Sequence, residues 1–470
     1  MNNNNQILFL SKLFSWSIIF EPLLFFIVTR SVGFNLTPAK ILELLFVFFF
    51  LLFVIFPLNT SKSFRLKLPD LNSLGYGFIY LFIFSLLIST LFGSLLGGYQ
   101  IDLTFNQSGD FNQNELNTKI IANAFRGIST IIFYFFFFTF LATVFLNTRE
   151  NLEYFFVNFR RVFLFCLLVG YIDYFLIIAT GYDLITRHAN EAISVGERFH
   201  SLAGEPRQAG VYMLFGLGVF YLEALLLRRP IKIYLFFLTI LAAILTTSIT
   251  LLLAMFIFVL LILPLYLVRL EWKKLLSIFL TSLTFLSLAI WAGNNVDLVA
   301  EYFSRIKTLV AYYDAFFDLW FILESQADLP YFVKIQLGEI YPLYDFISMI
   351  RNGEFLLVLF GSGPGSASLN NYSYVDMLMA YGNPNSYGVI LLYESGIIGS
   401  LIFLSAFFIP IKFAASSFRR EERLKLYTYM ALVLSASLAL KSPATYIFLG
   451  LAISTLTVIQ REEGVEGKEQ

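Results

Sequence analysis

Three arginines lie close together in the short segment 181–207, which reads GYDLITRHANEAISVGERFHSLAGEPR. They are Arg187, Arg198 and Arg207. Pro206 favours the first turn of a helix, and the free N–H groups and positive dipole end of a helix N-terminus stabilise an anion. The planar guanidinium group of arginine suits phosphate. The pattern indicates a phosphate-binding segment; the alternative is that these arginines bind lipid headgroups or carboxylates such as Glu191 and Glu197.

Groups that accept a proton occur in the same segment and farther along the chain. His200 and Glu205 lie beside the arginines, and Asp376 lies in a later polar stretch. An imidazole or carboxylate acts as a general base when it comes within hydrogen-bond reach of a hydroxyl group. The predicted catalytic residues are Glu205, Arg207, Asp376 and His200. Arg198 and Arg187 are predicted to bind substrate.

A second polar stretch runs from Leu359 to Leu401 and reads LFGSGPGSASLNNYSYVDMLMAYGNPNSYGVILLYESGIIGSL. Its first half is too polar for lipid and its second half is too apolar for water, so it predicts an external loop that re-enters a membrane. The glycines of GSGPG permit tight turns or the close approach of a ligand. No Lys-Ser or Lys-Thr pair follows them, so this is not a Walker motif.

Four further residues in and before this stretch are predicted to bind substrate. They are Arg351, Asn383, Asn385 and Glu394. Asn385, or Ser386 beside it, has the alternative role of capping the following helix. Glu394 falls some nine residues into that helix, so it is either buried among helices or faces a polar cavity.

The composition places these stretches in a membrane protein. The chain has 470 residues, of which 58% are hydrophobic and 56 are Phe, and its mean hydropathy is +0.76. Apolar runs fall near 8–29, 38–57, 74–97, 120–146, 161–180, 208–227, 231–247, 249–268, 274–292, 387–411, 426–440 and 445–459. The sequence therefore predicts an all-α, polytopic membrane helix bundle with about 12 transmembrane helices.

The spacing of the runs gives the predicted organisation. Residues 1–292 form membrane helices 1–9, with external loops at 98–119 and 181–207; residues 293–386 form a large external loop between helices 9 and 10; residues 387–459 form helices 10–12. Thr246, Thr247 and Ser248 alone separate two helices, which predicts a tight hairpin. The first part of the large loop, 298–320, has apolar residues at helical spacing. Such an amphipathic helix lies either at the membrane surface or against the external part of the protein.

Basic residues in alternate loops predict the orientation. Clusters occur at 62–67, 149–161, 228–232, 269–274 and 412–425, and all five fall on one face if both termini are cytoplasmic. The polar tail 460–470 is predicted to be cytoplasmic and disordered. Within the spans, Arg126 and Asp173 lie at similar depth on antiparallel helices and are predicted to form a buried ion pair.

Several classes of site and partner are excluded by the composition. The net charge is zero, so the overall charge implies no nucleic-acid partner. Cys166 is the single cysteine, and the two histidines are His188 and His200, so neither a disulfide framework nor a multi-histidine metal site is expected. No metal and no cofactor is predicted.

Both polar stretches resemble the O-antigen ligase/polymerase superfamily of bacterial membrane proteins. The resemblance lies in HSLAGEPRQAGVYML, which runs into a span, and in LFGSGPGSA and NPNSYGVILLYESGIIGSL around the later helix. The family pattern is a short polar, proline-containing segment, a large external loop ending in a Gly-x-Gly turn, a His-Asn-like motif and a Glu-x-Gly-Ile-x-Gly helix. The matching residues are Glu205-Pro206, Gly361-Ser362-Gly363, Asn385-Ser386-Tyr387 and Glu394 to Gly399.

The resemblance implies glycosyl transfer outside the cytoplasm of a bacterial inner membrane. A glycan on undecaprenyl pyrophosphate would pass to an acceptor hydroxyl without nucleotide or metal, with a flippase or chain-length regulator as a further partner. One departure matters: the ligases typically carry histidine just before the asparagine, and this chain has Pro384 there. That departure favours a polymerase-like member. The alternatives are a ligase of the same superfamily, a membrane transporter and a scaffold that determines cell shape.

Overall fold

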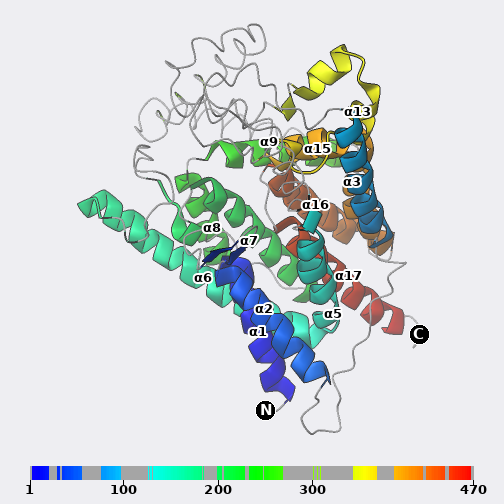
Figure 1. Cartoon of the computed structure of the whole chain (residues 1–470). Coiled ribbons are helices and arrows are strands. Elements are labelled where there is room, and N and C mark those ends of the chain that lie inside the picture. The colour runs from blue at the N-terminus through cyan, green and yellow to red at the C-terminus, as the bar shows by residue number, and fades with distance from the viewer. Residues whose placement is uncertain are drawn as a thin grey trace.

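Helices make up nearly all of the regular structure in the described chain (Figure 1). The computed structural model describes residues 3–20, 29–31, 34–36, 38–55, 76–96, 125, 128–129, 131–182, 184, 198–203, 206–227, 232–246, 248–267, 300, 304, 307, 342–343, 345–367, 386–416, 420–439 and 444–466. Among these, β-structure is confined to one short antiparallel hairpin, in which β1 (Thr29–Ser31) pairs with β2 (Phe34–Leu36). The predicted all-α fold is therefore confirmed in its coarse form, and the number of about 12 transmembrane helices stays a prediction.

The described helices follow the predicted apolar runs closely. They are α1 (Asn3–Phe20), α2 (Pro38–Ile55), α3 (Tyr76–Leu96), the π-helix η2 (Phe135–Leu141) with α5 (Ala142–Phe145), α6 (Arg149–Thr180), the 3₁₀ turn η3 (Ser201–Ala203), α7 (Pro206–Leu227), α8 (Ile233–Leu245), α9 (Ile249–Leu267), α13 (Phe355–Phe360), α15 (Tyr387–Ser416), α16 (Arg420–Ala439) and α17 (Ala444–Glu466). Every predicted run except 274–292 overlaps one of these helices, and 274–292 lies outside the described residues.

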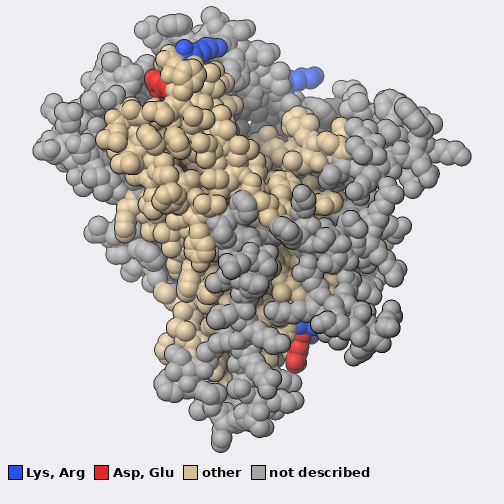
Figure 2. Space-filling model, turned by 90° about the vertical axis from the view of Figure 1, so that its right-hand side faces the viewer, with Lys and Arg blue, Asp and Glu red and all other residues tan. Residues whose placement is uncertain are grey.

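Three of these helices are long and apolar enough to cross a membrane, judged by length and composition. Their apolar segments are Arg149–Thr180, Pro206–Leu227 and Tyr387–Ala406, and shorter apolar helices accompany them. In Figure 2, charged side chains of the described residues lie near the top and bottom of the molecule, and a broad band between them shows almost none. A belt of that kind suits contact with lipid.

The helices pack in overlapping pairs. α1 lies against α2 and α6; α7 contacts α6, α8, α9, α16 and α17; and α15 contacts α3, α13, α16 and α17. The hairpin of α8 and α9 turns between Leu245 and Ile249, as the sequence predicts. In Figure 1, α3, α13 and α15 gather on one side, and α6 crosses the other side as the longest helix.

Phenylalanine rings from four helices form a continuous part of the core. Phe14 on α1 lies 5.3 Å from Phe46 on α2 and 5.6 Å from Phe155 on α6, measured between ring centroids. Phe46 lies 5.4 Å from Phe145 on α5. Each of these rings is fully buried. Edge-to-face and tilted aromatic pairs add stability beyond the apolar area that they bury. Much of the unusual phenylalanine content therefore serves packing.

Two predicted loops or tails are helical instead. The basic residues Arg149, Arg160 and Arg161 were predicted to lie between spans, but they belong to the first part of α6, which is 32 residues long. Arg149 is paired with Glu153, and Arg160 is paired with Glu223 of α7, so the helix continues through charged residues. α17 continues through Glu466, so the prediction of disorder from residue 460 was wrong for 460–466.

The large loop 293–386 is described only in parts. Ala300, Ser304 and Lys307 are helical, and the rest of the predicted amphipathic helix 298–320 lies outside the described residues. The later part includes a helical turn that ends at Arg351 and then α13. α13 packs against α3 and α15, so this end of the loop is fixed to the helix bundle.

Candidate functional site

The segment 198–203 lies on the C-terminal half of α6. The Ser201 hydroxyl donates to the Cys166 carbonyl oxygen at 2.9 Å. His200 Nε2 lies 3.2 Å from Asp173 Oδ2, and both side chains are almost completely buried. Ser201 has a φ of 50°, a conformation that residues other than glycine seldom adopt. These contacts fix the segment firmly against one helix.

The two ring nitrogens of His200 face different partners. Nδ1 lies 3.0 Å from the carbonyl oxygen of Ser201; that oxygen can only accept, so a hydrogen bond here requires the ring proton on Nδ1. Nε2 faces Asp173, whose other oxygen accepts from the backbone N–H of Leu184 at 2.8 Å. The Asp173 carboxyl group therefore links His200 to Leu184, four residues after the end of α6. In this arrangement His200 holds the segment in position and its ring is not presented to solvent.

Asp173 was also predicted to pair with Arg126. Arg126 lies outside the described residues, and the described partners of Asp173 are His200 and the Leu184 N–H. The Arg126–Asp173 pair therefore stays a prediction. The partnership with His200 was missed because the two residues are 27 positions apart and belong to a helix and a loop. The available signal was a carboxyl group inside an apolar run, which needs a partner.

Arg198 and the start of α7 meet at Thr246, in the turn between α8 and α9. Arg198 Nε donates to the Thr246 carbonyl oxygen at 3.0 Å, and the Phe199 N–H donates to Leu245 O at 3.0 Å. Gly210 of α7 packs on the same threonine, since a Cβ at Gly210 would lie 3.0 Å from Thr246 Oγ1. The turn therefore joins Arg198 to the first turns of α7.

Arg207 is the second residue of α7. Pro206 begins the helix and is buried, as its preference for the first helical position predicts, and Arg207 is partly buried. The first N–H groups of a helix have no partner within it, and the dipole is positive there. Arg207 lies one turn before Gly210, the residue through which α7 packs on Thr246. Glu205 and Arg187 lie outside the described residues.

The second candidate stretch forms a buried turn against a broken helix. All residues from Gly361 to Ala367 are buried. Ser362 N–H donates to Tyr393 O at 2.9 Å and Gly363 N–H donates to Glu394 O at 3.0 Å. The Glu394 side chain accepts from Gly365 N–H at 2.9 Å. The glycine turn therefore supplies donors to the backbone and the carboxyl group of Glu394.

The helix 387–411 was predicted as a single span, and the structure corrects this. α15 is interrupted at Gly396, whose φ is 65° and ψ is −172°. Tyr387 and Phe403 are 16 residues apart, about 24 Å along a straight helix, yet their ring centroids lie 5.5 Å apart. The chain therefore folds back at Gly396. Of the two predicted places for Glu394, the buried one is observed, since 7% of the residue is exposed.

The remaining predicted residues are not assembled with these two groups. Arg351 is exposed and ends the helical turn that precedes α13. Asp376, Asn383 and Asn385 lie outside the described residues. The described chain thus holds Arg198 at the Thr246 turn, on which α7 packs one turn after Arg207; it holds His200 against Asp173, and it brings Glu394 to the glycine turn. Among the described residues there is no group of three or more His, Cys, Asp or Glu side chains that could hold a metal ion.

The chain was compared with known proteins at the level of family, sequence and structure. Neither the protein-family models, nor the curated proteins, nor the solved structures contain a match to this chain.

Proposed function

We propose that this protein transfers a glycan from a polyprenyl pyrophosphate to an acceptor hydroxyl at the external face of a bacterial inner membrane, as a polymerase-like member of the O-antigen ligase/polymerase superfamily. The observation that carries the proposal is the junction at Thr246. Arg198 binds its carbonyl oxygen, and α7 begins beside it with Arg207. Two arginines and a helix N-terminus at one place form a suitable environment for a pyrophosphate.

The reaction needs little from the protein beyond charge stabilisation and a proton acceptor. The acceptor oxygen forms a bond to the anomeric carbon, the bond from that carbon to the pyrophosphate oxygen breaks, and the pyrophosphate leaves with the electron pair. Arg198, Arg207 and the amides of α7 stabilise the negative charge that develops on it. The donor is already activated, so the reaction requires no nucleotide.

The proton of the acceptor hydroxyl passes to a general base. Glu205, Asp376 and His200 were the predicted candidates. Both ring nitrogens of His200 face protein partners, so it suits the role of a residue that positions Arg198 and the start of α7. Glu205, next to Pro206 in the sequence, and Asp376 are the better candidates for the base.

The experiment is reconstitution of the purified protein in vesicles with an undecaprenyl-pyrophosphate-linked oligosaccharide. Glycan products of increasing length are expected, and they should form equally well in the presence of a chelator. Arg207→Ala, checked for normal folding, should reduce them about a hundredfold. If the folded wild-type protein releases no polyprenyl pyrophosphate from any offered donor, the proposal is wrong. Transfer to a lipid A acceptor without chain growth would assign the ligase activity instead.

A transporter is the second candidate, because of one specific observation. α15 is interrupted at Gly396 beside the buried Glu394, and interrupted helices near a buried charge are typical of secondary transporters. Uptake of a labelled solute into vesicles, with no change in any glycan, would favour this reading.

A further inference from the structure

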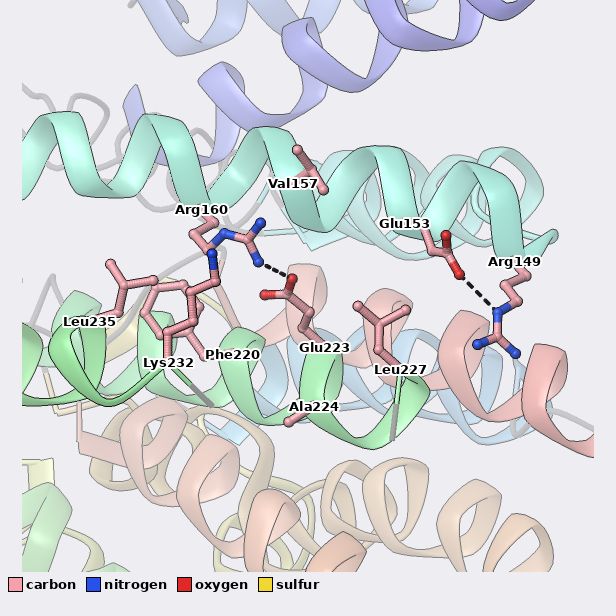
Figure 3. Close-up of a pocket in the computed structure, with 10 residues that line it drawn as sticks. All are labelled: Arg149, Glu153, Val157, Arg160, Phe220, Glu223, Ala224, Leu227, Lys232 and Leu235. Carbon is pink, nitrogen blue, oxygen red and sulfur yellow. Dashed lines mark hydrogen bonds and ion pairs between the residues drawn. The ribbon is translucent and has the colours of Figure 1, made fainter. Parts of the chain in front are cut away.

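A pocket lies at the end of α6 opposite to the Thr246 junction. Its volume is about 290 Å³, and α6, α7 and the start of α8 enclose it (Figure 3). Its lining residues are Arg149, Glu153, Val157, Arg160, Phe220, Glu223, Ala224, Leu227, Lys232 and Leu235. Arg160 and Asp173 are 13 residues apart on α6, which is about 20 Å along the helix axis. The pocket and the junction are therefore separate sites.

The charges in this pocket sum to one excess positive charge. Arg149 Nε lies 2.8 Å from Glu153 Oε1. Arg160 Nη1 forms an ion pair with Glu223 Oε1, and Lys232 also attracts Glu223 electrostatically. Three cations thus accompany two carboxylates. Figure 3 shows the Arg160 and Lys232 side chains entering the pocket from two different helices. One small anion would balance the excess charge.

The other walls of the pocket are apolar, and apolar surface continues outside it. Val157, Phe220, Leu227 and Leu235 line it between the charged groups. The residues of α8 beside Lys232 are exposed and apolar: Ile233 follows it directly and is 72% accessible, and Phe236, one turn farther along the same face, is 37% accessible. A free inorganic ion would make no use of this surface. A molecule with an anionic head and apolar chains matches both parts.

We propose that this pocket binds the phosphodiester headgroup of an anionic membrane phospholipid, whose acyl chains lie along the exposed face of α8. Lys232 and Arg160 hold the phosphate oxygens, and Glu223 keeps the Arg160 guanidinium oriented. Basic pockets between membrane helices bind anionic headgroups in this way. The proposal does not depend on the reaction catalysed at the other end of α6.

The test measures lipid retained by the purified protein. Wild-type protein and variants are placed in nanodiscs of phosphatidylcholine with a minor share of phosphatidylglycerol, released into mild detergent and examined by native mass spectrometry. Lys232→Gln removes one cation and leaves the Arg160–Glu223 pair intact. It should reduce retained phosphatidylglycerol about tenfold, the effect of one lost charge-assisted hydrogen bond. Lys232→Arg should retain the lipid.

Two further variants make the test specific. Arg161 is adjacent on α6 but exposed and outside the pocket, so Arg161→Gln should leave retention unchanged. Glu223→Gln removes a negative charge from the pocket, while its amide oxygen still accepts from Arg160 and keeps that side chain in place, so it should increase retention. The proposal is overturned if phosphatidylcholine is retained equally well, if Arg161→Gln lowers retention as much as Lys232→Gln, or if inorganic phosphate displaces the lipid at equal concentration. It is also overturned if folded Lys232→Gln keeps the wild-type amount.

Discussion

Gly361 and Gly396 place their backbones in direct contact. A Cβ atom at Gly361 would lie 2.5 Å from the nitrogen of Gly396, and a Cβ at Gly396 would lie 2.5 Å from the nitrogen of Gly361. Both residues have positive φ, 85° and 65°. The two glycines therefore allow the buried turn 361–365 to enter the break in α15, where its amides reach Tyr393 and Glu394.

Alanine at either glycine should reduce folded protein severely. Gly396→Ala adds backbone strain of about 1–3 kcal/mol, because its φ of 65° with a ψ of −172° is a conformation that essentially only glycine adopts, and it adds a clash with backbone atoms that cannot move aside. Gly353→Ala is the matched control, since Gly353 also has positive φ but a Cβ there would meet its nearest neighbour at 3.8 Å. Thermal unfolding in detergent gives the melting temperature of each variant. Equal melting temperatures for the two variants would contradict the packing argument.

The Asp173–His200 pair should appear as a coupled unit. Asp173→Asn and His200→Gln are each expected to cost about 3 kcal/mol of unfolding free energy, because each leaves a buried polar partner unsatisfied. The double variant should cost much less than the sum. The exposed Arg149–Glu153 pair on the same helix is the control, where Arg149→Gln should cost about 0.5 kcal/mol. Additive effects at positions 173 and 200 would show that the pair contributes no coupling.

Arg126 offers an independent test of what else stabilises Asp173. If Arg126 pairs with this carboxyl, Arg126→Gln alone should lower the amount of folded protein, because a charge is left unpaired in a low-dielectric setting. Arg126→Gln combined with Asp173→Asn should recover part of it. Fluorescence-detected size-exclusion chromatography gives the amounts. A double variant as impaired as both singles together would mean that the two residues are not partners.

Arg207 should be needed for activity more than for folding. Arg207→Ala is expected to reduce polymer formation about a hundredfold, and Arg207→Lys should lose most of it, because a point charge replaces a bidentate fork poorly. Arg198→Ala tests the arginine that binds Thr246, and Arg351→Ala tests a further residue that was predicted to bind substrate. Polymer length on a gel and the level of membrane protein are measured together.

The control is Arg305→Ala, on the predicted amphipathic helix, which should change little. Normal polymer from Arg207→Ala would place the pyrophosphate contact elsewhere. Loss of polymer in proportion to loss of protein would make Arg207 a structural residue.

The large loop is predicted to lie outside the cytoplasm. A cysteine at position 371, replacing Asn371, should react with an impermeant thiol reagent in intact cells made permeable at any outer barrier. Cys166→Ser provides the background, and Cys166 is itself buried. A cysteine replacing Lys62, in a predicted cytoplasmic loop, should react only after lysis. The reverse labelling pattern would overturn the predicted orientation.

The sequence predicted helices well and their interruptions poorly. Apolar runs locate the helices because lipid and core both demand continuous apolar residues, and the tight turn at Thr246 was evident from the run lengths. The predicted span was shorter than α6, because a charged residue such as Arg160 indicates a loop when its partner Glu223 is not known. The break at Gly396 depends on contact with Gly361, 35 positions earlier in the chain. The residues around Gly396 alone do not indicate that contact.

The candidate site was predicted in part for the same reason. Pro206 and Arg207 were correctly placed at the start of a helix, because that signal is local. The contact of Arg198 with Thr246 and of His200 with Asp173 joins distant parts of the chain. Such contacts are decided by how the helices pack. The residue types alone therefore indicated which residues were candidates for the site, but not which residues they contact.

α8 has only 13 residues, from Ile233 to Leu245, which corresponds to about 20 Å. The hydrocarbon core of a bilayer is about 30 Å thick, so if α8 crosses the membrane as the sequence predicts, it is shorter than the lipid layer around it. A bilayer meets such a hydrophobic mismatch by becoming thinner around the protein. One end of α8 adjoins Lys232 and the other adjoins Thr246. Local thinning there would bring the headgroups of the two leaflets closer together, and would lower the depth to which a lipid-linked pyrophosphate must enter to reach Arg198.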